Sequence, residues 1–201
     1  LQVGDVDRAV SAATHPSVIP EGASGVSEVI ERVVAKVPRR STQEGWLRAR
    51  LGAAVYFETA DYGRARAEFD RALEIAAAHR DPALELRTLA YETSVDHFDL
   101  RWQALLAKSR RVLKLARRID DPHSETYARY RAAYVFTHTG RTDEARLEVE
   151  ANLTAAERLG DHGLLTDALF LASTLARSPE TDSRSPSTTR YVAAVGPGSL
   201  R

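Results

Sequence analysis

The sequence predicts an all-α protein, a right-handed α-solenoid of antiparallel helical hairpins with a period of about 40 residues. Asp81, Asp121 and Asp161 mark this period, because they are equally spaced along the chain. Between these markers, apolar residues follow the i, i+3, i+4 spacing of amphipathic helices. A repeat of this length is typical of stacked supersecondary units, because one unit cannot bury its apolar face alone. Other positions that keep the interval are Leu73, Leu113 and Leu153.

Each interval holds two predicted helices with a turn between them. The first hairpin is expected to place helices at 46–59 and 64–79, separated by Asp61-Tyr62-Gly63. Aspartate caps helix N-termini and proline is tolerated in the first turn, so Asp81-Pro82 and Asp121-Pro122 are expected to begin new hairpins. The later helices are expected at 82–97, 102–119, 123–138, 142–159 and 163–177.

The chain is expected to contain three parts. Residues 1–40 comprise a partial repeat, a loop and a short amphipathic helix at 27–37. Residues 41–177 form the repeat array, and 178–201, rich in Ser, Thr, Pro and Gly, form a flexible tail or linker. The sequence contains no methionine, so we interpret it as a piece of a longer protein.

The turn between the two helices of a hairpin has a recurring sequence. Tyr56 precedes Ala-Asp-Tyr-Gly-Arg-Ala at 60–65, and related strings occupy 140–145 and 4–9. These residues resemble the signature of the tetratricopeptide repeat, in which a tyrosine precedes a Gly-Asp-Tyr-type turn and an alanine. The resemblance covers about residues 41–177 and the first dozen. It implies stacked hairpins whose first helices line a concave groove.

The sequence departs from this family in its period and in its second repeat. The period found here is longer than the family's usual length of about 34 residues. Asp96 stands where the first repeat has Tyr56 and the third has Phe136, and Ser109 replaces Phe69. We therefore expect polar pairing or local exposure there. The longer units end in Ala-Arg-Arg-Ile-Asp-Asp-Pro at 116–122 and in Ala-Glu-Arg-Leu-Gly-Asp-His at 156–162. With these endings they resemble the helical arms of MalT-like transcription activators and of cyclase-linked bacterial regulators.

Composition narrows the class of function. The 28 Lys and Arg residues balance the 28 Asp and Glu residues, so no net charge attracts nucleic acid or an anionic membrane. Cysteine is absent, which excludes disulfides, thiolate metal sites and a cysteine nucleophile. No apolar run is long enough to span a bilayer, and no signal peptide opens the chain. We expect a cytoplasmic protein, and the preference for arginine and alanine suggests a bacterial origin.

The sequence lacks motifs of catalytic chemistry. It contains no phosphate-binding loop, no Gly-x-Ser-x-Gly turn and no His-x-x-x-His spacing. Its many charged residues are interpreted as i, i+4 pairs on helix surfaces rather than as acid–base pairs. We therefore predict that the protein is not an enzyme and uses no cofactor and no metal.

Tyrosines form a stripe on the first helix of the third hairpin. Tyr127, Tyr130 and Tyr134 follow an i, i+3, i+7 spacing, so they share one face of that helix. Facing a groove, they would offer apolar contact and orienting hydroxyls. The alternative, that they pack between hairpins, stays open. The predicted groove residues are Arg50, Phe57, Arg87, His97, Tyr127, Tyr130, Tyr134 and Phe170.

The predicted helix at 101–118 is strongly basic. No acidic residue accompanies its cations before Asp120. Such cations contact phosphate in nucleic-acid-binding proteins, with an affinity that falls as salt rises. We favour a solvated outer face, whose last turn complements the helix dipole. The predicted basic face comprises Arg110, Arg111, Lys114, Arg117 and Arg118.

These observations predict a non-catalytic binding or scaffold module. We expect it to be the ligand- or protein-sensing arm of a larger bacterial signalling or transcription regulator. The expected partner is a protein, a peptide or a small effector; membrane and nucleic acid are disfavoured, and self-association stays open. One alternative is a free-standing protein–protein adaptor. Another is a nucleic-acid-binding helical-repeat protein that uses the helix at 101–118.

Overall fold

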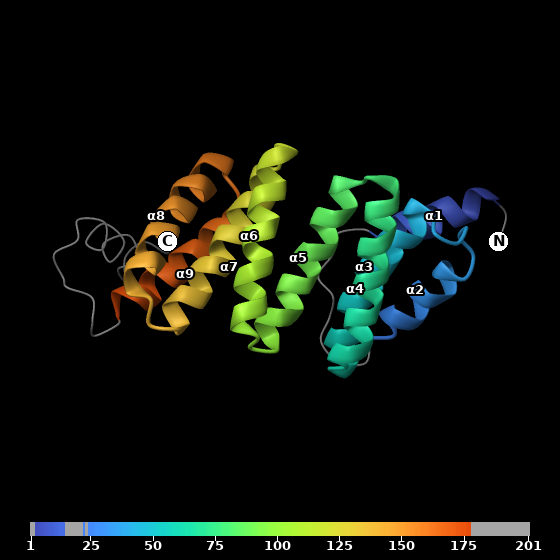
Figure 1. Cartoon of the computed structure of the whole chain (residues 1–201), viewed down its shortest axis with the longest axis horizontal. Helices are drawn as coiled ribbons and strands as arrows, with labels where there is room; N and C mark the ends of the chain where they lie inside the picture. The colour runs from blue at the N-terminus through green and yellow to red at the C-terminus, as the bar shows by residue number, and fades with distance from the viewer. Residues whose placement is uncertain (1–2, 15–21, 23, 178–201) are drawn as a thin grey trace, which may run out of the picture. The chain divides into compact units, whose positions relative to one another are not determined.

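The chain is all-α in the part that the structure describes. The computed structural model describes residues 3–14, 22 and 24–177, and within these ranges it contains nine helices and no strand (Figure 1). The all-α prediction is confirmed. The predicted tail at 178–201 lies outside the described residues, as does most of the loop predicted before residue 27. The helices are α1 (Val3–Thr14), α2 (Val26–Val34), α3 (Thr42–Thr59), α4 (Tyr62–His79), α5 (Pro82–Phe98), α6 (Trp102–Arg118), α7 (Pro122–His138), α8 (Thr142–Leu159) and α9 (His162–Ala176).

The chain divides into two compact units within α6. The N-terminal unit ends at Ala104, and the C-terminal unit begins at Leu105. The N-terminal unit therefore contains α1 to α5, and the C-terminal unit contains most of α6 with α7, α8 and α9.

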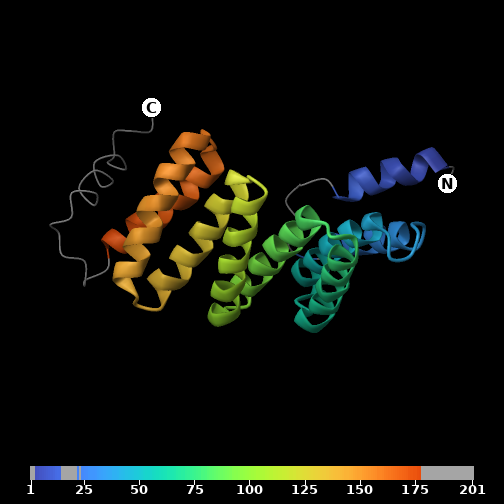
Figure 2. The ribbon, with the colours of Figure 1, turned by 45° about the horizontal axis from the view of Figure 1, so that its top comes forward.

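In the N-terminal unit α3 is the central helix. It packs against α1, α2, α4 and α5, and α4 also packs against α5 (Figures 1 and 2). The core beside it contains Leu47, Val55 and Phe69, all almost fully buried. A second cluster, which includes Ile75 and Leu84, joins α4 and α5 to α3. Most of the apolar surface of α3 is thus removed from water, which is the main stabilising term in folding.

The C-terminal unit repeats this arrangement around α7. This helix packs against α8 and α9, and α8 packs against α9. Val135 and Ala145 are buried in the same way as Val55 and Ala65, which occupy the same positions two repeats earlier. The packing of both units therefore follows the predicted period.

The helix starts follow the predicted aspartates. The Asp81 carboxylate accepts hydrogen bonds from the N–H groups of Ala83 and Leu84 at 3.1 and 3.0 Å. Asp121 and Asp161 cap α7 and α9 in the same manner. Because these bonds satisfy donors that have no partner inside a helix, each aspartate fixes the residue at which its helix begins.

Helix α3 begins at Thr42, ahead of the expected start at Trp46. The sequence analysis overlooked the cap at Ser41, whose hydroxyl accepts a hydrogen bond from the Glu44 N–H at 3.2 Å. Ser41-x-x-Glu44 is a capping-box sequence, although here the Glu44 carboxylate accepts from the Arg40 N–H instead. Helix α2 likewise ends at Val34 rather than at residue 37, because Ala35 to Val37 form a tight turn.

Residues with a left-handed backbone recur at a constant interval from Arg40 to Gly160, and this interval is half the repeat period. Their φ angles lie between 53° and 72°. Two of the seven are the glycines Gly140 and Gly160, which stand where their helices end, as is typical of glycine in this conformation. The other five carry side chains, for which this conformation costs roughly 1–2 kcal/mol. The seven residues are Arg40, Ala60, Arg80, Leu100, Asp120, Gly140 and Gly160.

Glycine at position 60 is expected to stabilise the protein. Ala60 has a φ of 56° and is exposed, so Ala60→Gly relieves the strain without removing a packed side chain. After subtraction of the extra unfolded-state entropy of glycine, the expected gain is about 0.5–1 kcal/mol. The reverse change, Gly160→Ala at a φ of 65°, should cost a similar amount. Urea denaturation measures both, and a loss of stability in Ala60→Gly would contradict the expectation.

The second repeat shows the polar pairing that was expected. Asp96 is fully buried and accepts a hydrogen bond from the Tyr62 hydroxyl at 3.0 Å. Ser109 is also buried, and its hydroxyl donates to the Leu105 carbonyl oxygen at 2.8 Å. Both polar side chains therefore have partners at positions where the first repeat has the aromatic residues Tyr56 and Phe69.

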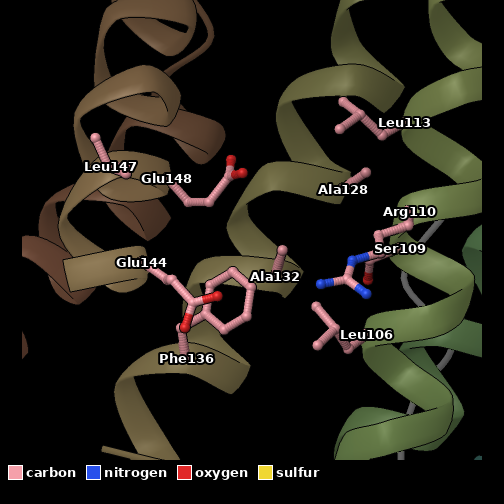
Figure 3. Close-up of a pocket in the computed structure, with 10 residues that line it drawn as sticks. All are labelled: Leu106, Ser109, Arg110, Leu113, Ala128, Ala132, Phe136, Glu144, Leu147 and Glu148. Carbon is pink, nitrogen blue, oxygen red and sulfur yellow. The ribbon is translucent and has the colours of Figure 1, made fainter. Parts of the chain in front are cut away.

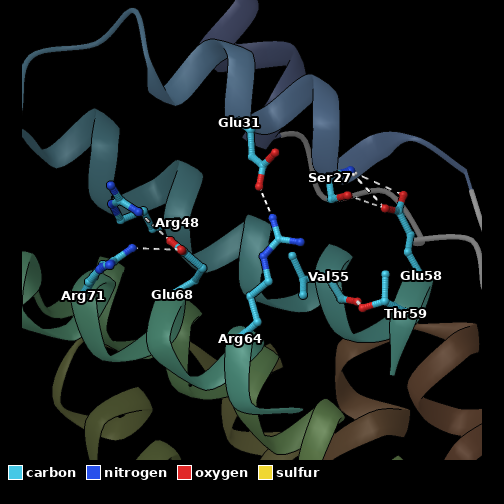
Figure 4. Close-up of polar contacts among 9 residues, drawn as sticks. All are labelled: Ser27, Glu31, Arg48, Val55, Glu58, Thr59, Arg64, Glu68 and Arg71. Carbon is cyan, nitrogen blue, oxygen red and sulfur yellow. Dashed lines mark hydrogen bonds and ion pairs between the residues drawn. The ribbon is translucent and has the colours of Figure 1, made fainter. Parts of the chain in front are cut away.

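The Glu58 side chain of α3 caps the N-terminal end of α2, the helix packed against α3 (Figure 4). The residue that precedes α2 is Gly25, which has no side chain for this purpose. The Glu58 carboxylate accepts from the Val26 N–H at 2.7 Å and from the Ser27 hydroxyl at 2.5 Å. Burial alone would raise its pKa, but hydrogen bonds from Ser24, Ser27 and Val26 hold the pKa of Glu58 below its ordinary value. The negative charge also complements the N-terminal end of the α2 dipole.

Acid is expected to destabilise the N-terminal unit through Glu58. Because the folded-state pKa is lowered, the ionised carboxylate stabilises the fold above the unfolded value of about 4.3. This stabilisation is lost as pH falls through the folded-state pKa. Glu58→Gln should lower the free energy of unfolding at neutral pH and flatten its decline between about pH 5 and pH 3. Trp46 and Trp102 both belong to the N-terminal unit, so tryptophan fluorescence in urea follows its unfolding.

The matched control for this prediction is Glu74→Gln. Glu74 is an exposed glutamate of α4, so its replacement changes the net charge by the same amount. The free energy of unfolding of this variant should depend on pH in the same way as that of the parent protein. Equal profiles for all three proteins would show that the cap does not contribute.

Candidate binding face on α7 and α9

Four rings form a ladder along α7. The ring centroids of Tyr127 and Tyr130 are 6.4 Å apart, and those of Tyr130 and Tyr134 are 6.3 Å apart. The His138 ring stacks on Tyr134 at 3.9 Å. Tyr130 is only 9% exposed, whereas Tyr127 and Tyr134 are half-buried and His138 is exposed. The ladder therefore has one ring in the core and three that reach the surface.

Arg131 contacts two of these four rings. Its guanidinium carbon lies 4.7 Å from the centre of the Tyr127 ring and 5.4 Å from that of Tyr130. The guanidinium also donates a hydrogen bond to the Tyr127 hydroxyl. Since Arg131 is buried, these cation–π contacts are strengthened by the loss of competing water. These contacts restrict the positions of both rings.

The Asp167 carboxyl group of α9 interacts electrostatically with Tyr130 and Arg131. Burial raises the pKa of Asp167 above its ordinary value, although the charge of Arg131 opposes this rise. Burial and the Asp167 charge together raise the pKa of Tyr130 to about 12. The Tyr130 phenol is therefore neutral at physiological pH, which leaves its hydroxyl able to donate a hydrogen bond.

Phe170 adds an exposed apolar group to the same unit. It occupies on α9 the position that Tyr130 occupies on α7, one repeat earlier, and it is 53% exposed. Helices α7 and α9 pack against each other. We call Tyr127, Tyr134, His138 and Phe170 the aromatic face. Aromatic groups with polar edges are enriched in protein interfaces, because they combine apolar area with oriented hydrogen bonding.

The remaining predicted groove residues belong to the N-terminal unit. Arg50 is almost fully buried and donates to the Tyr91 hydroxyl at 3.3 Å. Phe57 is half-buried, and His97 lies against the exposed Phe98 ring at a centroid distance of 5.3 Å. Arg87 is exposed. Their part in a common groove with the α7 tyrosines remains a prediction.

The N-terminal unit also contains a pocket that the sequence did not reveal. It has a volume of about 490 Å³ and lies between α1, α2 and α3. Its walls are the small or aliphatic side chains of α1 and α2, and Arg50 reaches it from α3. Apolar side chains follow the same helical spacing in a pocket wall as in a packed helix face, so the sequence alone could not distinguish the two.

The predicted basic residues are all exposed on α6. Arg117 forms an ion pair with Glu125 at 3.0 Å, so part of its charge is balanced within the C-terminal unit. Among the described residues, no three His, Asp or Glu side chains gather where they could hold a metal ion. None of the helices described here is long and apolar enough to cross a membrane.

No protein-family model matches the chain, and no curated protein matches it significantly.

Proposed function

We propose that the chain is a non-catalytic binding module, and that the aromatic face binds a protein or peptide partner. The observation that carries this proposal is the ladder of rings on α7, with Arg131 holding two of them in place. Fixed aromatic side chains lose little conformational entropy when a partner covers them. Buried Tyr130 and Arg131 support the face, and Tyr127, Tyr134, His138 and Phe170 make the contact.

The array that presents this face is, in our proposal, a right-handed stack of antiparallel hairpins of the tetratricopeptide type. The packing of α3 against α4 and α5, and of α7 against α8 and α9, supports this arrangement. The sequence resemblance favours a cytoplasmic arm of a larger bacterial regulator. Binding to such an arm shifts the equilibrium between packing states of neighbouring hairpins, and so the state of an attached domain.

Peptide selection tests the aromatic face. A displayed peptide library is selected on the immobilised chain, and the affinities of the selected peptides are measured by fluorescence polarisation. Tyr134→Ser combined with Phe170→Ser should weaken the dominant peptides by about tenfold or more, because exposed aromatic anchors supply most of the binding energy.

Phe98→Ser is the matched control. Phe98 is 52% exposed, almost the same as Phe170, but it belongs to the N-terminal unit. Its replacement should leave the affinities unchanged. Unchanged binding in the Tyr134 and Phe170 double variant, or an equal loss in the control, would exclude the aromatic face as the site.

The pocket of the N-terminal unit supports a small apolar effector as a second candidate ligand. Its volume of about 490 Å³ falls within the usual range for small-molecule sites, and its lining is mainly apolar. Titration with octanoate, followed by amide chemical shifts, tests this candidate. Shifts confined to α1, α2 and the part of α3 around Arg50 would support it, and unchanged spectra would exclude it.

A further inference from the structure

A second pocket lies in the C-terminal unit, on a different side of α7 from the tyrosines. It has a volume of about 220 Å³ and is bounded by α6, α7 and α8 (Figure 3). Helix α7 supplies Ala128, Ala132 and Phe136, which alternate in sequence with the tyrosine ladder. The i, i+4, i+8 spacing of these three residues defines a separate stripe on α7.

The pocket exists because its walls carry small side chains. Ser109 stands where the first repeat has Phe69, and its hydroxyl is occupied by the Leu105 carbonyl oxygen. Ala128 and Ala132 project only methyl groups toward the space. Leu106, Leu113 and Phe136 complete an apolar lining. An apolar cavity of about 150 Å³ accommodates benzene, so this volume admits one aromatic or aliphatic side chain.

The rim of the pocket carries charges of both signs. Arg110 points toward the opening from α6, whereas Glu144 and Glu148 lie on the α8 side (Figure 3). Each glutamate already has a cationic partner, because Arg141 pairs with Glu144 and Arg129 pairs with Glu148. Arg129 also pairs with Glu125, which Arg117 contacts from α6, and the Arg110 charge acts on Glu144. With these partners the rim has four arginines for three glutamates, and Lys114 is exposed one turn beyond Arg110.

Leu147 extends the apolar surface beyond the opening. It lies on the rim and is 69% exposed, the largest exposed fraction of any large apolar side chain in the described residues. Exposed apolar groups beside a pocket are typical of interaction surfaces. A partner that fills the pocket would cover Leu147 and place its own charged groups beside Arg110 and Lys114.

We propose that this pocket docks an acidic amphipathic peptide segment, which inserts one phenylalanine or leucine side chain and places a carboxylate beside Arg110. Charge complementarity selects the acidic partner, since both glutamates of the rim are paired and the cations of α6 are in excess. The site goes beyond the aromatic face and shares no residue with it. The chain would therefore hold two partner segments at once.

Amide chemical-shift titration of the full chain tests this site with defined probes. The first probe is a blocked pentapeptide, Glu-Glu-Phe-Glu-Glu. The other peptides replace either its four glutamates with lysine or its phenylalanine with serine, and an oligothymidylate represents nucleic acid. The acidic phenylalanine peptide should shift the amides of Ser109 and Ala132, and the two altered peptides should bind at least about fivefold more weakly.

Substitutions at the rim and in the pocket complete the test. Arg110→Ala and Leu147→Ser, both at exposed positions, should each weaken the acidic peptide by about threefold to fivefold. Arg118→Ala removes the same charge from α6 away from the pocket and should change the affinity less than about twofold. Ala132→Leu fills the pocket and should abolish binding, and its own spectrum reports whether it folds.

Three results would overturn the proposal. The first is equal binding of the lysine or serine peptide. The second is unchanged affinity in both Arg110→Ala and Leu147→Ser. The third is a stronger shift of the same amides by the oligothymidylate, which would assign the surface to nucleic acid. None of these variants alters the aromatic face, so failure here leaves the test of that face independent.

Discussion

Gly52→Val is expected to destabilise the N-terminal unit by about 3 kcal/mol. A Cβ atom at Gly52 would lie 2.6 Å from Cε1 and 2.8 Å from Cδ1 of Phe69. It would also lie 2.9 Å from the Ala65 carbonyl oxygen, which belongs to the backbone of α4. Phe69 is 2% exposed and cannot swing aside, so α3 and α4 would have to separate. Urea denaturation followed by tryptophan fluorescence measures the effect.

Gly63→Ala is the control for this prediction. Gly63 also lies in a helix, but the nearest atom to an added Cβ is Asp61 Oδ1, at 3.5 Å. Alanine should be tolerated there or stabilise α4 slightly, because it loses less backbone entropy than glycine. Phe69→Leu should recover part of the loss caused by Gly52→Val, since it shortens the obstructing side chain. A Gly52→Val protein as stable as its parent would show that α3 and α4 pack less closely than described.

Gly52 illustrates what the sequence could and could not predict about the fold. The repeat period and the aspartate caps are local patterns, and they placed most helix boundaries close to where the structure has them. Glycine within a helical pattern weakens the prediction of a helix. Nothing in the neighbouring sequence indicates that Phe69 occupies the space beside Gly52. The five left-handed residues that carry side chains, such as Ala60 and Arg80, also escaped notice, because only glycine marks such a position in a sequence.

The candidate sites also combine features that the sequence could predict with features that depend on the folded structure. The spacing of Tyr127, Tyr130 and Tyr134 is visible in the sequence, since i, i+3, i+7 positions share a helix face. The role of Arg131 depends on how its long side chain folds back over two rings. Asp167 acts from another helix, and that proximity exists only after α7 and α9 pack. Pockets are harder still, because they arise from volume that small side chains leave empty.

Asp96 lies in a polar cluster that interrupts the apolar repeat. Its carboxylate accepts from the Tyr62 hydroxyl, and the Arg101 guanidinium lies over the Tyr62 ring at 4.2 Å. Burial, the charges of Asp99 and Asp96 and a hydrogen bond to Asp99 raise the pKa of Tyr56 above its ordinary value. The expected polar pairing thus extends from the end of α3 to the end of α5. Such buried networks are stable only while each member keeps its partners.

Asp96→Ala should therefore lower the free energy of unfolding of the N-terminal unit by about 3 kcal/mol. The change removes the acceptor of the Tyr62 hydroxyl at a site closed to water and leaves a small cavity. Tyr62→Phe deletes only the hydroxyl and should cost about 1–2 kcal/mol. If the hydrogen bond stabilises the unit, the double variant will lose at least about 0.5 kcal/mol less than the sum of the single losses. Additive losses, measured by tryptophan fluorescence in urea, would show that this hydrogen bond does not account for the contribution of Asp96.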